Sequence, residues 1–95
     1  MIRHTVHFSG RVQGVGFRYT AALIARRFDV AGYVQNLDDG RVRVVAEGEP
    51  DQVAAYIDAV SERMSRNITD QTADETPATL EFGRPGEPDT FAVRY

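Results

Sequence analysis

Gly10, Gly14 and Gly16 separate a stretch with strand-like alternation from a stretch with helical spacing. Glycines let a backbone curl so that several N–H groups point inward. A helix that follows adds its unpaired N–H groups and the positive end of its dipole. Arg18, in the first turn of that expected helix, supplies a cation with a planar donor fork. The segment therefore predicts a phosphate site.

We expect the phosphate to contact the whole loop. Its residues are Gly10, Arg11, Val12, Gln13, Gly14, Val15, Gly16 and Phe17. The loop is neither of the two common phosphate motifs: the P-loop ends in Gly-Lys-Ser/Thr, and the sequence contains no lysine. The dinucleotide motif requires a third glycine three residues after Gly16, where Tyr19 stands. On these residues alone, a glycine-rich turn with a solvated arginine is an equally open interpretation.

Composition narrows the class of protein. The chain has 95 residues, a length that predicts one domain spanning residues 1–95. Without cysteine it has no thiolate nucleophile and no cysteine metal site. The net charge of −3 argues against nucleic acid as a partner. No apolar run is long enough to cross a membrane and no signal segment follows Met1, so we expect a cytoplasmic protein.

Hydrophobic periodicity gives the order of elements. Strands are expected over residues 2–9, 30–36, 41–47, 68–75 and 90–95, and helices over residues 17–28 and from Pro50 to Met64. The strand over 68–75 is polar and belongs at a sheet edge, while residues 76–89 read as a loop with a possible short strand near Leu80. The order predicts a ferredoxin-like α+β fold: a βαββαβ sandwich of one antiparallel sheet with both helices on one face, plus an extra C-terminal strand.

Three segments resemble the acylphosphatase family. Gly10–Arg18 resembles its signature, Gly32–Val42 resembles its second motif G-x-V-x-N-x-x-D-G-x-V, and Phe91–Tyr95 resembles its usual C-terminus. The resemblance covers nearly the whole chain and implies the same ferredoxin-like fold. It also implies hydrolysis of acyl phosphates without metal or cofactor. In the family pattern, the arginine matching Arg18 binds phosphate and the asparagine matching Asn36 positions the attacking water.

The chemistry of the loop agrees with that implication. It offers no Ser, Thr, Cys or His to attack phosphorus, and no nearby carboxylate cluster suggests magnesium. Such a site helps only a substrate whose leaving group needs no protonation, and a carboxylate leaving an acyl phosphate is one. Water would be the nucleophile, and the Asn36 amide offers both an acceptor and a donor to orient it. From the residues alone, Asn36 is also explained as a turn initiator before Asp38-Asp39-Gly40.

Two other functions compete with this one. Acylphosphatase-like domains are also fused to larger maturation proteins, where they handle carbamoyl phosphate. The chain begins at Met1 and ends at the matching terminal motif, so we expect a free-standing, monomeric enzyme. An RNA-binding ferredoxin-like domain requires exposed aromatic residues on the central strands, and His7, Arg41 and Arg43 provide none. The expected partners are a small acyl phosphate and inorganic phosphate, which is both product and inhibitor, with neither nucleic acid nor membrane involved.

Overall fold

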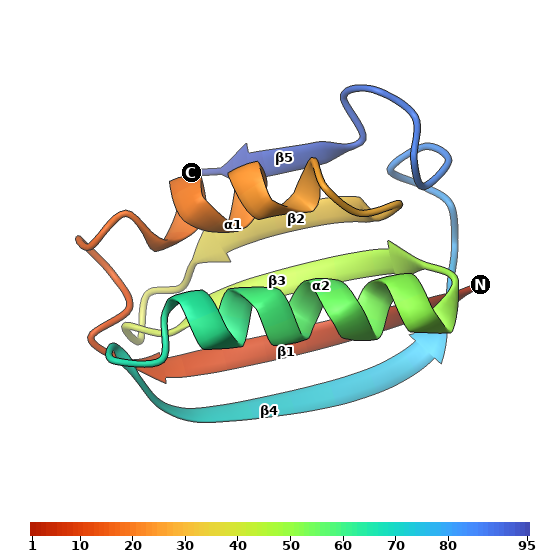
Figure 1. Cartoon of the computed structure of the whole chain (residues 1–95). Helices are drawn as coiled ribbons and strands as arrows, with labels where there is room; N and C mark the ends of the chain where they lie inside the picture. The colour runs from red at the N-terminus through yellow and green to blue at the C-terminus, as the bar shows by residue number, and fades with distance from the viewer.

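The computed structural model describes residues 1–95 and has the predicted ferredoxin-like α+β fold. The elements are β1 (Ile2–Gly10), α1 (Phe17–Ala25), β2 (Ala31–Asn36), β3 (Val42–Gly48), α2 (Pro50–Arg63), β4 (Ile68–Pro77) and β5 (Phe91–Arg94). The strands form one sheet in the order β4-β1-β3-β2-β5, and both helices cover the same face (Figure 1). Neighbouring strands are antiparallel except β5, which pairs with β2 in parallel and makes the sheet mixed.

The core lies between the sheet and the two helices. Fully buried side chains from β1 and β3, such as Val6 and Val44, meet the apolar stripes of α1 and α2. The two helices are joined directly by Tyr56, whose hydroxyl donates to the Ala21 carbonyl at 2.9 Å. Phe8 at the end of β1 packs on Phe17 at the start of α1, with ring centroids 5.1 Å apart. This aromatic contact fixes both ends of the glycine-rich loop.

Helix α1 ends at Ala25, three residues before the end that its apolar spacing predicted. The next residues tighten into i→i−3 turns, in which Arg26, Arg27 and Phe28 donate to the carbonyls three positions earlier at 3.0–3.2 Å. The apolar spacing continues because the Phe28 ring still packs against Tyr56, 6.1 Å away. The periodicity therefore reported burial correctly but overestimated the length of the helix.

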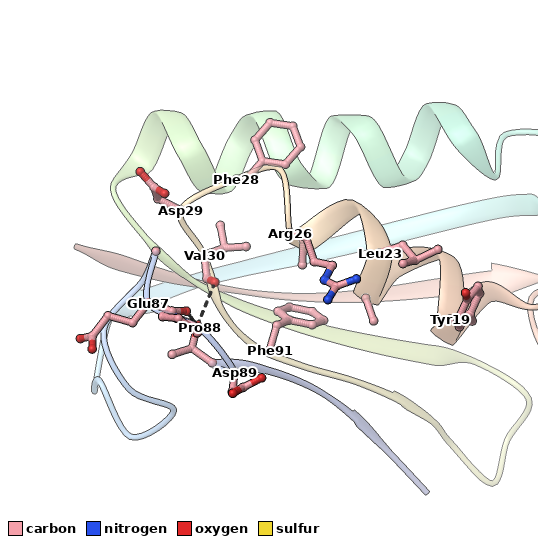
Figure 2. A pocket seen from close by; sticks show the side chains of 14 residues that line it. Tyr19, Leu23, Arg26, Phe28, Asp29, Val30, Glu87, Pro88, Asp89 and Phe91 are labelled. Carbon is pink, nitrogen blue, oxygen red and sulfur yellow. Dashed lines mark hydrogen bonds between the residues drawn. The ribbon is translucent and has the colours of Figure 1, made fainter.

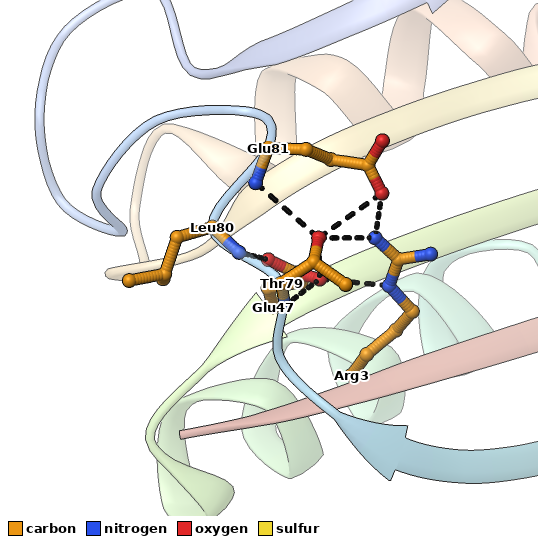
Figure 3. A network of polar contacts seen from close by, with 5 residues as sticks. All are labelled: Arg3, Glu47, Thr79, Leu80 and Glu81. Atoms are coloured by element: carbon orange, nitrogen blue, oxygen red, sulfur yellow. Dashed lines mark hydrogen bonds and ion pairs between the residues drawn. The ribbon is translucent and has the colours of Figure 1, made fainter.

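The connection from β4 to β5 is a loop held on the open face of the sheet, and no short strand forms at Leu80. The fully buried carboxylate of Glu47 accepts hydrogen bonds from the backbone N–H groups of Thr79 and Leu80, at 2.9 and 2.8 Å, and from Arg3 at 2.7 Å (Figure 3). Burial alone would raise the pKa of Glu47, but these three donors outweigh it and lower the pKa. The loop is thus anchored to β1 and β3 before it delivers β5 to the edge of β2.

Candidate active site

The glycine-rich loop presents unpaired backbone donors. Gly14 and Gly16 have φ angles of 75° and 79°, in the left-handed region that glycine adopts readily. Gly16 is the N-cap of α1 and has no side chain to cap the helix. No backbone N–H from Val12 to Tyr19 donates a hydrogen bond within the protein, and the first helical bond starts at the Thr20 N–H. Curled backbone and a bare helix N-terminus together form an electropositive cradle suited to an anion.

A pocket of about 200 Å³ lies at this cradle, enclosed by the loop, the first turn of α1, the end of β2 and β5. Its lining consists of Val12, Gly14, Gly16, Phe17, Arg18, Tyr19, Asn36, Val93 and Tyr95. Arg18 and Asn36, which lie on different elements, therefore face the same space. The topology explains why Arg18 and Asn36 lie at one pocket. Strands β1 and β2 run in the same direction, so β2 ends at the same end of the sheet from which the β1–α1 loop leaves β1 (Figure 1).

Arg18 is held by the last strand. One terminal nitrogen of its guanidinium donates to the Arg94 carbonyl at 3.2 Å, and its central carbon lies 4.6 Å from the centroid of the Tyr95 ring. No carboxylate forms an ion pair with Arg18. The cation is therefore fixed in direction by β5 while its charge is left uncompensated beside the unpaired N–H groups.

Asn36 is only partly buried, but one of its side-chain atoms is in an unusual position. Its Oδ1 is buried and has no hydrogen-bond partner, which is a costly arrangement unless a ligand or a water molecule occupies the position. The following turn does not use this oxygen. It is closed by the Leu37 N–H donating to the Arg41 carbonyl at 2.8 Å and by the Gly40 N–H donating to the Leu37 carbonyl at 3.2 Å.

The beginning of the predicted loop supports the pocket without lining it. Gly10 has a φ of 122°, and a Cβ there would lie 2.3 Å from the Asn67 carbonyl oxygen. The Arg11 N–H already donates to that same oxygen at 2.9 Å. Gly10 and Arg11 therefore join the loop to the segment before β4, and Val15 at the loop tip is exposed to solvent.

Gln13 also lies outside the pocket, yet it connects two parts of the site. Its Nε2 donates to the Leu37 carbonyl at 2.7 Å and to the Arg41 carbonyl at 3.0 Å. These carbonyls belong to the β2–β3 turn that begins immediately after Asn36. The amide of Gln13 thus holds the glycine-rich loop at a fixed distance from the β2–β3 turn and from Asn36, which precedes that turn.

Three pocket residues were not predicted from the sequence: Tyr19, Val93 and Tyr95. Tyr19 follows Arg18 directly, so its position was a signal that could have been used. Val93 and Tyr95 reach the pocket only because β5 pairs with β2, which no local pattern specifies. Elsewhere, no three His, Cys, Asp or Glu side chains are grouped closely enough to bind a metal ion. Neither helix has the length and apolar character required to span a membrane.

Comparison with known proteins places the chain in a family. The family model described as Acylphosphatase matches residues 4–86. The acylphosphatase of Bacillus velezensis is 42% identical over 96 residues, covering 100% of both chains. The chain belongs to the acylphosphatase family. The family resemblance read from the sequence is therefore confirmed, and hydrolysis of acyl phosphates is the activity that membership supports.

Solved structures agree with this assignment. The crystal structure of acylphosphatase from Bacillus subtilis matches with a TM-score of 0.82 and 34% identity, covering 100% of each chain. The structure of HypF from T. kodakarensis matches with a TM-score of 0.75 and 30% identity. That match covers 100% of this chain and 12% of the HypF chain. The fold of this family thus occurs both as a chain of this length and within a much longer one.

Replacing Gly14 with alanine is expected to weaken the binding of inorganic phosphate. A Cβ at Gly14 would meet no atom within 4 Å, so the change adds only backbone strain at a φ of 75°. That strain costs about 1–2 kcal/mol and favours a loop whose N–H groups no longer converge. Gly40→Ala is the matched control, because Gly40 has a φ of 92° and equally open surroundings but does not line the pocket. Calorimetric titration with phosphate should show weaker binding for Gly14→Ala alone; equal affinities would contradict the assignment.

Proposed function

We propose that the chain hydrolyses acyl phosphates to a carboxylate and inorganic phosphate, with the phosphoryl group held by the Gly10–Gly16 loop and Arg18 and the attacking water oriented by Asn36. One observation carries the proposal: Asn36, whose buried Oδ1 has no hydrogen-bond partner, lines the same pocket as Arg18 and the loop with its unpaired N–H groups. An acceptor facing a cluster of anion donors is the arrangement needed to set a water molecule against a bound phosphoryl group.

Each part of the pocket has a distinct role in the reaction. The loop N–H groups and the Arg18 guanidinium donate to the phosphoryl oxygens and stabilise their charge in the transition state. Asn36 Oδ1 accepts a hydrogen bond from the water, whose oxygen forms the new bond to phosphorus. The bond between phosphorus and the acyl oxygen breaks, and its electron pair leaves with the carboxylate. The proton lost by the water passes to a phosphoryl oxygen or to solvent, so no side chain is required as general base. The carboxylate is a weak base and leaves without protonation, so no general acid is required either.

Inorganic phosphate, the product of the reaction, is also the expected inhibitor. Inorganic phosphate would occupy the same cradle as the phosphoryl group, so it should compete with the substrate. The net charge of −3 supports a small-molecule substrate over nucleic acid.

A second candidate is a module that binds phosphate or carbamoyl phosphate without turnover. The likeness to HypF supports it, because the matched region is 12% of that much longer chain. The same fold therefore also occurs as one part of a larger protein. The two functions differ in one measurable respect. A binding module would bind inorganic phosphate and leave benzoyl phosphate intact, whereas the proposed enzyme hydrolyses it.

The assay that tests the proposed function compares benzoyl phosphate with p-nitrophenyl phosphate, each with and without EDTA. We expect hydrolysis of benzoyl phosphate alone, at a rate that EDTA does not change, because the pocket supplies cationic and N–H donors but no acid for a poorer leaving group. Loss of activity in EDTA that is restored by magnesium would show that the mechanism is wrong.

A further inference from the structure

A second hollow continues from the phosphate pocket along α1. It is a groove of about 500 Å³ between α1, the loop of residues 86–90 and the start of β5 (Figure 2). Tyr19 lines both the groove and the phosphate pocket. On the facing strand the two hollows also follow one another, because Val93 lines the pocket and Phe91 lines the groove. The groove is therefore an extension of the candidate active site.

The side chains of α1 give the groove its direction. Tyr19, Leu23 and Arg26 follow one another along the helix, and Phe91 faces them from β5 (Figure 2). Tyr19 lies in the turn that borders the phosphate cradle, and at 1.5 Å of rise per residue Arg26 lies about 10 Å further along. A group attached to a phosphoryl moiety in the pocket thus has roughly that length of surface along which to extend.

The end of the groove nearest the phosphate pocket favours an apolar occupant. Tyr19 and Leu23 are 69% and 42% exposed, so two large apolar side chains of one helix face are left uncovered. Half of the lining residues are hydrophobic, and the polar ones lie toward the far end. There the single cation, Arg26, is outnumbered by the carboxylates of Asp29, Glu87 and Asp89. A substrate with a second negative charge is therefore disfavoured.

We infer that this groove binds the acyl group of the substrate and selects acyl phosphates with an extended apolar chain or an aromatic ring. The inference rests on the proposed function, because it places the phosphoryl end of the substrate in the neighbouring pocket. The volume is within the range of small-molecule sites, which combine apolar lining residues with a few polar groups. Leu23 then acts as a specificity-determining residue that contacts the chain of the substrate.

A series of straight-chain substrates tests the inference. The probes are acetyl, butyryl, hexanoyl and octanoyl phosphate. From butyryl onward the leaving carboxylates have nearly equal basicity, so differences in kcat/KM report binding of the chain. A fully buried methylene is worth about fourfold, and an open groove should give about two- to threefold for each one added. Equal kcat/KM values from butyryl to octanoyl phosphate would overturn the inference.

Two matched variants locate the effect. Leu23→Gln keeps the size of the side chain and a good helix former. It should reduce the gain in kcat/KM from butyryl to octanoyl phosphate about two- to fourfold, the effect of losing roughly one methylene contact. Leu80→Gln makes the same change at a comparably exposed leucine, 46% accessible and outside the groove, and should retain the full gain. An unchanged gain in Leu23→Gln would overturn the inference, whereas failure of the parent protein to hydrolyse even acetyl phosphate would overturn the proposed function instead.

Discussion

Replacing Arg18 with lysine should lower kcat by about 10³-fold or more, the scale on which an arginine that stabilises a transferring phosphoryl group contributes. The lysine would keep the positive charge. It would lose the planar fork, which can donate to the Arg94 carbonyl and face the Tyr95 ring while other N–H groups remain for the phosphoryl oxygens. A flexible ammonium would therefore be neither fixed nor able to donate twice in one plane. Steady-state kinetics with benzoyl phosphate measure the loss, and inhibition by inorganic phosphate measures the accompanying loss of affinity.

The control is Arg63→Lys, which makes the same change at an exposed arginine in the last turn of α2. Its kinetics should match those of the parent protein. If Arg18→Lys also behaves like the parent, a bare positive charge is sufficient and the geometric role given to β5 is wrong.

Replacing Asn36 with alanine should separate binding from chemistry. The loop and Arg18 hold the phosphoryl group, so inhibition by phosphate should be nearly unchanged. The water loses its acceptor, so kcat should fall on the order of 10²–10³-fold, as when one preorganised polar group is removed from other active sites. Stability should fall by no more than about 1–2 kcal/mol, because Oδ1 makes no hydrogen bond whose loss would destabilise the fold.

Kinetics, phosphate inhibition and urea unfolding of one preparation test all three expectations. Asn67→Ala is the control, since Asn67 is the other asparagine of the chain and lies outside the pocket. A variant of Asn36 with normal kcat and weakened phosphate inhibition would reverse the roles assigned here. A variant that fails to fold would indicate that the residue serves the turn.

The parts of the site that could be predicted are those encoded locally. Glycines at positions needing positive φ, followed by a helix, specify the cradle through the conformational limits of single residues, and Gly14 and Gly16 have such angles. The strands and helices could also be predicted locally, because the alternating and helical spacings of apolar residues lie within each element. Asn36 required more, because it joins the site only where the end of its strand lies beside a loop from another part of the chain.

What could not be predicted depends on contacts between distant segments. Nothing in residues 91–95 indicates that their strand pairs in parallel with β2 or that Tyr95 lies over Arg18. The groove beside α1 could not be predicted either. Tyr19 and Leu23 fall on the exposed side of a helix, and only the loop of residues 86–90 converts that side into one wall of a hollow.

The contact between Arg18 and Arg94 joins residues that are 76 positions apart in the chain. The parallel pairing of β5 with β2, which begins at Gly32 and Phe91, likewise joins distant segments. Their closure must precede any energetic gain from the pairing, which makes it a slow event in folding. Helices α1 and α2 can pack on the antiparallel strands before it happens. Before β5 pairs, Arg18 lacks its contacts with Arg94 and Tyr95, so we expect catalysis to return after denaturation only once this last strand is in place.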